Sequence, residues 1–340
     1  MALRLSLSDS WSPDVIRPWE RVLEQDRDAG VFSTPSWLQA WWETLGSGEL
    51  LLATVWDDGD PIAVFPGCRC VSESGLLTFL GGEDVTDQQV PVAVPGREAH
   101  ALSFFLDWAF TEGGFRRLRF HSVPSTERWR DVVGSVADEK GLAHASEQVD
   151  VSPEIVLPAT FDEYLASLSG HDRHELRRKR RRLDEAGKVT VRRAHEVGWE
   201  DDLAAFFEFH RQAPGEKAAF FTEERERFFR RLAADLFLFG MARLDVLDLD
   251  GEPVACTFSY DFRGSLELYN SSFRPDLAKL APGMVLIGHL IEQAIAEGKA
   301  RFDFLRGDER YKMRFGPVPR PVYQVMLAVP ATSGQHEGRI

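Results

Sequence analysis

The sequence has no hydrophobic segment long enough to cross a membrane. None of its 340 residues lies in a run that approaches the roughly 20 apolar residues a membrane-spanning helix needs. Residues 1–11 also lack the apolar stretch of a secretory signal. From these two absences we expect a soluble, cytoplasmic protein.

Cysteine is scarce as well. The three cysteines, Cys68, Cys70 and Cys256, form no CxxC pair, and no histidine stands beside them at a spacing suited to a metal. The pattern favours small reduced core residues, as in cytoplasmic proteins. The sequence therefore predicts neither a disulfide framework nor a metal site.

Positive charge is in short supply overall. With 40 basic and 54 acidic residues the formal net charge is -14, which argues against a general DNA binder, because such proteins need positive charge to displace counterions. The apolar fraction of 44%, with 24 Phe and 9 Trp, suffices for packed cores, and the length suits two domains.

Two parts of the chain have the same order of elements. An Asp-Gly dipeptide joins the apolar runs 50–56 and 61–65, and another joins 244–249 and 253–258. Asp-Gly between two β-rich runs is the strongest short-range signal for a hairpin. Each hairpin is followed by a further strand or strands, a helix ending near glycine, and a short strand. The later helices and strands are predicted at 101–110 with 118–120 and at 284–295 with 302–304, and earlier helices at 35–45, 199–212 and 223–236.

This repetition predicts a duplicated α/β domain, with an α+β mixed sheet in each copy. Pro153 and Pro158 interrupt the periodicity within residues 149–160, so we place the boundary there. The expected division is a first domain at 1–150, a second at 151–330, and a flexible tail at 331–340.

The second half offers an anion site at a helix start. Lys279, Pro282 and Gly283 stand before the predicted helix, and Met284 begins it. Unpaired N–H groups at a positive helix end suit a diphosphate, Pro282 has no N–H to waste, and Gly283 lets a phosphate approach. A plain turn capping a core helix is the alternative.

A dense polar cluster follows the strand at 302–304. Its carboxylates provide a candidate general base, Tyr311 a candidate general acid, and Arg306 and Lys312 candidate contacts to phosphate or an anionic acceptor. A solvated charged loop is the alternative. The candidate bases are Asp303, Asp308 and Glu309.

A basic segment lies between the two halves. Residues 177–182 are six consecutive Lys or Arg, within a predicted helix that has only a thin apolar stripe. A solvated helix with i,i+4 pairs, Glu175 with Lys179 and Arg180 with Asp184, is one interpretation. The other is capture of a phosphate-bearing ligand, for which we select Arg177, Arg178 and Arg181.

The order of elements in the second half resembles that of GNAT (N-acetyltransferase) enzymes. The residues Tyr269-Asn270-Ser271, Pro282-Gly283 and the signature Asp303 to Lys312 resemble a bacterial GNAT family often labelled cellulose-biosynthesis (CelD/BcsL-like) acetyltransferases. The similarity extends over roughly residues 30–325. One departure is Thr86 to Gln89, where such proteins often have Asp-Tyr, which puts an acceptor-binding role of that loop in doubt. The segment Tyr311 to Gly316 also resembles a phosphate-contact element of Fem-type ligases, which use aminoacyl-tRNA.

The resemblance implies tandem GNAT folds and an acyltransferase that uses acyl-CoA, without a metal. The donor would bind the second domain at Tyr269, Asn270, Lys279, Gly283, Met284 and Lys312, with a backbone N–H near Tyr269 and Asn270 polarising the thioester carbonyl. No nucleophile-elbow sequence is present, so direct attack by an amine or hydroxyl is expected.

The first domain is expected to be non-catalytic and to shape the acceptor site, because Pro124-Ser125-Thr126 stands where the signature would be. The expected acceptor is a small molecule or a cell-envelope precursor. Two rival functions stay open: a Fem-like aminoacyltransferase with a tRNA donor, and a non-catalytic binding or scaffold protein with the GNAT fold.

Overall fold

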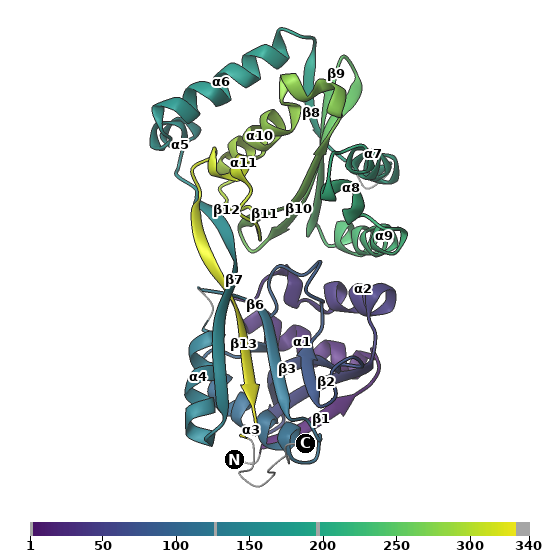
Figure 1. The fold of residues 1–340 in the computed structure, drawn as a ribbon, viewed down its shortest axis with the longest axis vertical. Coiled ribbons are helices and arrows are strands. Elements are labelled where there is room, and N and C mark those ends of the chain that lie inside the picture. The colour runs from purple at the N-terminus through teal and green to yellow at the C-terminus, as the bar shows by residue number, and fades with distance from the viewer. Residues whose placement is uncertain (1–2, 126–127, 195–197, 331–340) are drawn as a thin grey trace, which may run out of the picture. The chain divides into compact units, whose positions relative to one another are not determined.

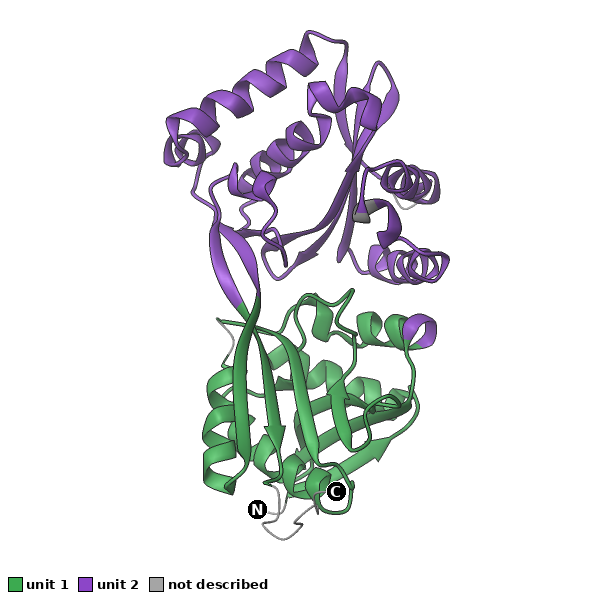
Figure 2. Cartoon of the chain, viewed as in Figure 1, with its two compact units in different colours: residues 1–42, 46–149, 322–340 green, residues 43–45, 150–321 purple. Residues whose placement is uncertain are grey.

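A computed structural model describes residues 3–125, 128–194 and 198–330 of the chain (Figure 1). The chain divides into two compact units (Figure 2). Unit 1 comprises Met1–Trp42, Gly46–Val149 and Val322–Ile340, and unit 2 comprises Glu43–Leu45 and Asp150–Pro321. Each unit has its own sheet region and its own hydrophobic core.

Unit 1 is a twisted sheet with helices on it, in the strand order β1-β2-β3-β4-β6-β13-β7. Neighbours among its first strands are antiparallel, whereas β4 and β6 are parallel. Its elements are β1 (Leu3–Ser8), α1 (Pro13–Gln25), η1 (Val31–Ser33), α2 (Pro35–Leu45), β2 (Glu49–Asp57), β3 (Asp60–Arg69), β4 (Leu76–Phe79), β5 (Val92–Ala93), α3 (Glu98–Phe110), β6 (Arg117–Pro124), α4 (Trp129–Lys140) and the start of β7 (Ala143–Val156).

Unit 2 repeats this arrangement, in the strand order β7-β12-β11-β10-β9-β8. Helix α10 lies on one face of its sheet, and α7 and α9 lie on the other (Figure 1). Its elements are the end of β7, α5 (Phe161–Ser167), α6 (Gly170–Asp184), β8 (Val189–Arg193), α7 (Trp199–Arg211), α8 (Glu216–Phe220), α9 (Glu223–Leu238), β9 (Ala242–Leu249), β10 (Glu252–Phe262), β11 (Ser265–Phe273), η2 (Pro275–Leu280), α10 (Pro282–Ala296), β12 (Arg301–Asp303), α11 (Arg310–Met313) and the start of β13 (Val318–Ala328).

The two units confirm the predicted duplicated α/β fold with a mixed sheet. In both, a strand, a set of helices and an antiparallel hairpin lead to a fourth strand, which is followed by a helix and a strand parallel to the fourth. The Asp-Gly dipeptides form the hairpin turns with positive φ at both positions, 49° and 92° at Asp58 and Gly59, and 54° and 90° at Asp250 and Gly251. These are the backbone angles that a two-residue turn between twisted strands requires.

The two units divide between Val149 and Asp150, within a continuous strand. Strand β7 runs without interruption from Ala143 to Val156 and carries the chain from unit 1 into unit 2. Proline has no N–H to donate, but Pro153 still pairs through its carbonyl. This carbonyl accepts a hydrogen bond from the Phe304 amide at 2.9 Å, so the strand continues through the proline. The predicted second domain ended at residue 330, whereas residues 322–328 of β13 pair with β6 in unit 1. The predicted tail at 331–340 lies outside the described residues.

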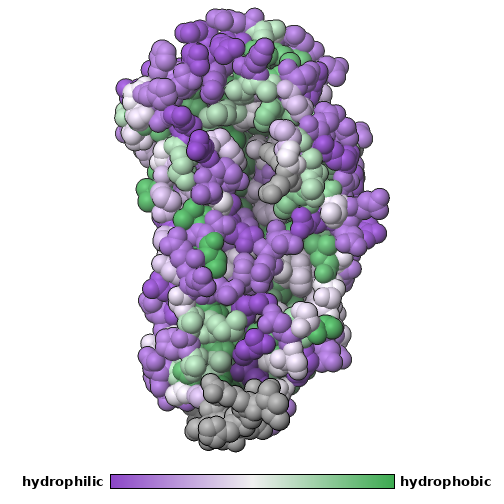
Figure 3. All heavy atoms as spheres, viewed as in Figure 1, coloured by the Kyte–Doolittle hydropathy of each residue, from purple (hydrophilic) through white to green (hydrophobic). Residues whose placement is uncertain are grey.

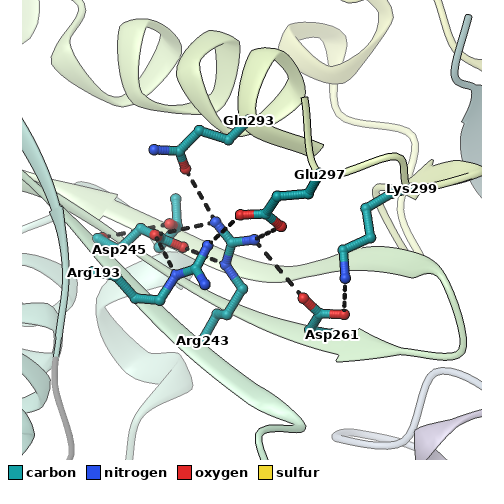
Figure 4. Close-up of polar contacts among 8 residues, drawn as sticks. Arg193, Arg243, Asp245, Asp261, Gln293, Glu297 and Lys299 are labelled. Carbon is teal, nitrogen blue, oxygen red and sulfur yellow. Dashed lines mark hydrogen bonds and ion pairs between the residues drawn. The ribbon is translucent and has the colours of Figure 1, made fainter. Parts of the chain in front are cut away.

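An ion network fixes the C-terminal end of α10 (Figure 4). Arg243 on β9, with 2% of its side chain exposed, pairs with Asp245 at 3.1 Å and with Glu297 at 3.0 Å. Its guanidinium also donates to Gln293 on α10 at 3.1 Å. Cations near the last turn complement the negative end of the helix dipole. The end of α10 that lies away from the candidate site is thus rigidly held.

Candidate functional site

Strands β11 and β12 part soon after they meet. Their parallel register covers only three residue pairs and ends with Glu267 opposite Asp303, whereas β11 continues to Phe273. On the other side of β11, Phe258 pairs with Asn270 and Ser259 pairs with Leu268, so Tyr269 is the extra residue of a bulge. Bulges commonly re-aim side chains beside functional sites. The predicted splayed strand is therefore present around Tyr269 and Asn270.

The first turn of α10 presents its backbone without a protein cap. Its N-cap residue is Ala281, at φ 53°, and among the described residues no side chain caps the turn and no acid stands in it. Gly283 is buried, and a Cβ there would lie 3.1 Å from the Phe273 ring. The glycine is therefore also needed for close packing of α10 on β11. Lys279, predicted to add charge, is exposed in η2 just before this turn.

A cavity of about 520 Å³ lies between α6, the first turn of α10 and α11. We call it the cationic cavity, because four basic side chains and only two acidic ones line it. Leu176 and the predicted Met284 contribute apolar wall, and Tyr311 lines it from α11. The basic residues are Arg178, Lys179, Arg310 and Arg314.

The two acids of the cationic cavity are held by three of its bases. Glu175 lies 2.8 Å from Arg178 and 3.8 Å from Lys179, and the Arg178 hydrogen bond, together with these two charges, lowers the pKa of its carboxyl. Asp172 pairs with Arg314 at 2.9 Å, and hydrogen bonds from Ser169 and Arg314 lower its pKa. At neutral pH the cavity keeps an excess of positive charge, and the surface over α6 is largely hydrophilic in Figure 3.

Tyr311 joins the cationic cavity to the splayed strand. Its hydroxyl forms a hydrogen bond with the Ser271 side chain on β11. Burial and the nearby Glu309 charge raise the pKa of Tyr311, so the phenol is protonated at neutral pH. A protonated hydroxyl beside the cavity and β11 is suited to donate a proton.

Asp303 is buried where β11 and β12 part. Its Oδ1 accepts hydrogen bonds from the Ser152 hydroxyl at 2.9 Å and from the Leu305 amide at 2.7 Å, and burial raises the pKa of its carboxyl. Its register neighbours are Glu154 on β7 and Glu267 on β11, both also buried. Three carboxyl groups therefore lie abreast on adjacent strands, and the sequence had indicated only one.

Glu154 is the partly neutralised member of this row. It pairs with Arg320 on β13 at 2.5 Å, while burial and the charge of Asp303 raise the pKa of its carboxyl. A like charge disfavours ionisation of a neighbour, so the three carboxyls favour retention of at least one proton.

The signature residues after β12 form a tight turn. Gly307, at φ 119°, and Leu305, at φ 54°, bend the chain, and the Lys312 ammonium donates to the carbonyls of Arg306 at 2.7 Å and Gly307 at 3.3 Å. Lys312 also pairs with Glu309 at 2.9 Å. The buried ammonium is committed to holding this turn, which differs from the predicted contact to phosphate or coenzyme A.

The other signature residues occupy varied surroundings. Asp308 and Glu309 are exposed, whereas Arg306 is largely buried with its Nε 3.9 Å from Asp150 on β7. Among the three candidate bases, Asp303 alone is enclosed by protein.

The predicted basic helix is α6, and its three selected arginines lie in different surroundings. Arg178 lines the cationic cavity, Arg177 lines a second cavity between α5, α6 and α10, and Arg181 is exposed with Glu185 at 3.7 Å. Of the predicted i,i+4 pairs, Glu175 with Lys179 is present at 3.8 Å. Arg180, predicted to pair with Asp184, pairs with Glu292 of α10 at 2.9 Å.

Within the part of the chain that the structure describes, the equivalent helix start in unit 1 also has no side-chain cap, but its first turn carries an acid. Helix α3 begins with Glu98, whose buried carboxylate accepts a hydrogen bond from the Gly96 amide at 3.1 Å. The same carboxylate pairs with Arg128 at 2.5 Å. An acid at this position satisfies the positive helix end, and a bound anion would be repelled.

The gap between β4 and β6 in unit 1 is also closed. The Gln89 amide donates to the carbonyls of Phe79 and Leu80 at 2.8 and 2.7 Å, and its oxygen accepts from the His121 amide at 3.1 Å. The neighbouring Thr86 is buried and accepts from the Trp37 indole at 3.2 Å. Side chains of the loop at residues 86–89 therefore bridge these strands and pack in the interior of unit 1.

Within residues 3–125, 128–194 and 198–330, no group of three or more His, Cys, Asp or Glu is placed to hold a metal ion. Of the helices that the structure describes, none combines the length and apolar character needed to span a bilayer.

Residues 170–313 match the family model described as acetyltransferase (GNAT) domain. This segment begins with α6 and includes the splayed strand, the open end of α10 and α11. The enzyme class that the domain defines is an acyltransferase of the GNAT type. The finer cellulose-labelled family stays a prediction.

Solved structures share the whole fold. FemX aligns with TM-score 0.67 and 12% identity over 95% of this chain and 97% of its own. L-PGS from Bacillus licheniformis aligns with TM-score 0.55 and 14% identity, over 88% and 93%. A tandem GNAT protein from the clavulanic acid biosynthesis pathway aligns with TM-score 0.52 and 11% identity, over 97% and 100%. At such identities the likeness shows the tandem fold alone. No curated protein matches the sequence significantly.

Proposed function

We propose that this protein transfers an acyl group, in the simplest case acetyl, from acyl-CoA to an amine or hydroxyl by direct attack. Unit 2 holds the donor. The observation that carries the proposal is the uncapped, acid-free first turn of α10 beside the cationic cavity, whereas the corresponding turn in unit 1 contains the buried acid Glu98.

The residues around α10 fit the phosphates of coenzyme A. Backbone amides of Gly283 and Met284 stand at the positive helix end, and Arg178, Lys179 and Arg310 line the adjoining cavity. The coenzyme supplies an acyl group activated as a thioester. The protein provides orientation and charge: amides near Tyr269 and Asn270 on the bulged strand are suited to bind the thioester carbonyl.

Proton transfer falls to Tyr311 and a carboxylate. The protonated hydroxyl of Tyr311 is suited to protonate the departing thiolate. Asp303, with its raised pKa, is the favoured base for the acceptor's proton, because Glu309 is held by Lys312 and Asp308 is exposed to solvent. The acceptor is a small molecule or a cell-envelope precursor.

A Fem-like aminoacyltransferase is the second candidate. The observation that favours it is α6, whose exposed basic residues extend beyond those that line the cationic cavity. Under this function the protein would bind tRNA with steep salt dependence, and coenzyme A would not stabilise it. A scaffold protein with the GNAT fold would respond to neither and would have no turnover.

One binding experiment separates these functions. Thermal unfolding is followed with acetyl-CoA, free coenzyme A and tRNA, at low and high salt. Acyl transfer predicts that acetyl-CoA at 100 times its Kd adds about 2.7 kcal/mol of stability. Stabilisation by tRNA alone would favour the Fem-like function, and no response to any thioester would contradict the proposal.

A further inference from the structure

A second cavity, of about 180 Å³, lies between α5, α6 and α10. We call it the ring-lined cavity. It shares two wall residues, Leu176 and Met284, with the cationic cavity, so the two spaces are neighbours along the first turns of α10. Its wall is mostly apolar, with the rings of Phe161, Tyr164 and His289 among its lining residues.

The polar atoms of these rings do not make the wall charged. The Tyr164 hydroxyl donates to the Phe315 carbonyl at 2.9 Å. Burial and the charge of Arg180 lower the pKa of His289, so its imidazole is neutral at pH 7. The wall therefore offers flat apolar surfaces to a ligand.

Gly288 leaves space that the protein does not use. A Cβ built there would meet no atom within 4 Å. Glycine inside a helix costs about 1 kcal/mol relative to alanine. Packing within this chain would therefore allow a side chain at this position. A ligand in the ring-lined cavity would not, because it would need the space that the side chain takes.

Two guanidinium groups also line the cavity, from α6. Arg180 also forms an ion pair with Glu292 of α10 at 2.9 Å. Arg177 is exposed, and its guanidinium has no ion-pair partner among the described residues. A ligand that fills the cavity would therefore bring a flat apolar group together with an anion of its own.

We propose that the ring-lined cavity binds the nucleoside half of the donor: an adenine against the rings, with the ribose 3′-phosphate at Arg177 and Arg180. The inference rests on the proposed function, since it requires the diphosphate in the cationic cavity. In coenzyme A a single ribose separates the base from the diphosphate, which matches two cavities that share a wall. An alkyl chain would suit the apolar wall but would provide no anion for Arg177.

The 3′-phosphate allows a sharp test, because dephospho-coenzyme A lacks only that group. Calorimetric titration should show that the protein binds coenzyme A roughly tenfold more tightly than dephospho-coenzyme A, as a charge-assisted contact is expected to do. Arg177→Ala should remove most of this preference and leave the Kd of dephospho-coenzyme A unchanged. Arg182→Ala is the matched control: it removes the same charge from α6, and Arg182 lines neither cavity.

A second variant tests the cavity without changing charge. Gly288→Leu fills space that no protein atom occupies, so the melting temperature should not fall. It should weaken binding of coenzyme A and of adenosine 3′,5′-bisphosphate at least tenfold. Binding of 4′-phosphopantetheine, which has no nucleoside, should stay unchanged.

Specific results would overturn the inference. Equal Kd values for coenzyme A and dephospho-coenzyme A, or unaltered coenzyme A binding in Gly288→Leu, would place the nucleoside elsewhere while leaving the proposed function intact. Octyl phosphate binding that Gly288→Leu abolishes, without any preference for the 3′-phosphate, would assign the cavity to an alkyl chain. Failure of coenzyme A, acetyl-CoA and 4′-phosphopantetheine alike to bind would remove the proposed function as well.

Discussion

The two units have the same fold but treat the same helix end in opposite ways. In unit 1, Glu98 occupies the start of α3, and Gln89 bridges the strands beside it. In unit 2, α10 begins with Pro282 and Gly283 beside a cavity rich in basic side chains. The comparison teaches that the fold provides a potential anion site twice, and that a few side chains decide which copy keeps it.

The largest expected effect is on the free energy of unfolding, and it concerns the arginines at the C-terminal ends of α10 in unit 2 and α3 in unit 1. Arg243→Met should lower the free energy of unfolding by about 3 kcal/mol, because it leaves the buried Asp245 without its main partner. In unit 1, Arg69 donates to Gly113 beyond the end of α3 but is 38% exposed, so Arg69→Met should cost under about 1 kcal/mol. Urea unfolding of both variants measures the difference, and equal losses would contradict it.

The next effect tests where the chemistry occurs. Tyr311→Phe should lower kcat about 100-fold with little change in the KM for acetyl-CoA, because it removes a proton donor. Thiol release with a responsive acceptor is the measurement. Tyr323→Phe, in the unit 1 part of β13, is the control and should keep full activity. A Tyr311→Phe enzyme with undiminished kcat would exclude Tyr311 as the acid.

A smaller effect should follow from giving α10 the acid that α3 has. Met284→Glu places a carboxylate in its first turn, where acids favour the helix but repel a diphosphate. The Kd for acetyl-CoA should rise about tenfold or more. Met284→Gln, of similar size and uncharged, should change it by less than about threefold, and Glu98→Gln in unit 1 should not change it. Similar losses in the Glu and Gln variants would show that charge at this end is unimportant.

The smallest effect concerns the row of buried carboxyls, which the β4–β6 pair of unit 1 lacks: Thr78 pairs there with Arg119. Burial raises the pKa of Asp303 above its ordinary value of 3.8, so ionisation is disfavoured in the folded state. Asp303→Asn can keep both hydrogen bonds to Oδ1 and should raise stability by about 1 kcal/mol at pH 7.

The sign of the pH dependence follows from the raised pKa. Well below pH 3.8 the carboxyl is protonated in both folded and unfolded chains, so the gain from Asp303→Asn should vanish there. The gain should grow as the pH rises through the raised pKa. Melting temperatures from about pH 2.5 to 8 measure it. A gain that is constant with pH would contradict the assigned cause, and full turnover in this variant would exclude Asp303 as the base.

Local signals were sufficient to predict most elements of the fold. Asp-Gly turns and apolar periodicity predicted the hairpins, and the segment 35–45 begins and ends where α2 does. The continuity of β7 through Pro153 was not predicted, because this proline was interpreted as an interruption of the pattern. Proline lacks an N–H, but this does not interrupt β7, because Pro153 pairs through its carbonyl. The local sequence does not tell which backbone groups of a strand will form hydrogen bonds with its neighbours.

The candidate site was only partly predictable, because its residues meet through tertiary pairing. Glu154 and Glu267 flank Asp303 only through the register of three strands, which no spacing in the sequence encodes. Lys312 was interpreted as a phosphate contact, whereas its ammonium donates to the Arg306 carbonyl. The sequence alone does not reveal whether a lysine in a polar motif faces solvent or binds backbone carbonyls. By contrast, the start of α10 was predictable from the local sequence, because Pro282 and Gly283 mark a helix start.

The most direct measurement compares hydrogen exchange at the two helix ends. Peptides covering residues 281–290 and 97–106 are followed by mass spectrometry with and without acetyl-CoA. The account predicts slower amide exchange in the first turn of α10 on binding and unchanged exchange at the start of α3. Binding that leaves the α10 peptide unchanged, or protects α3 equally, would contradict the assignment of the donor to unit 2.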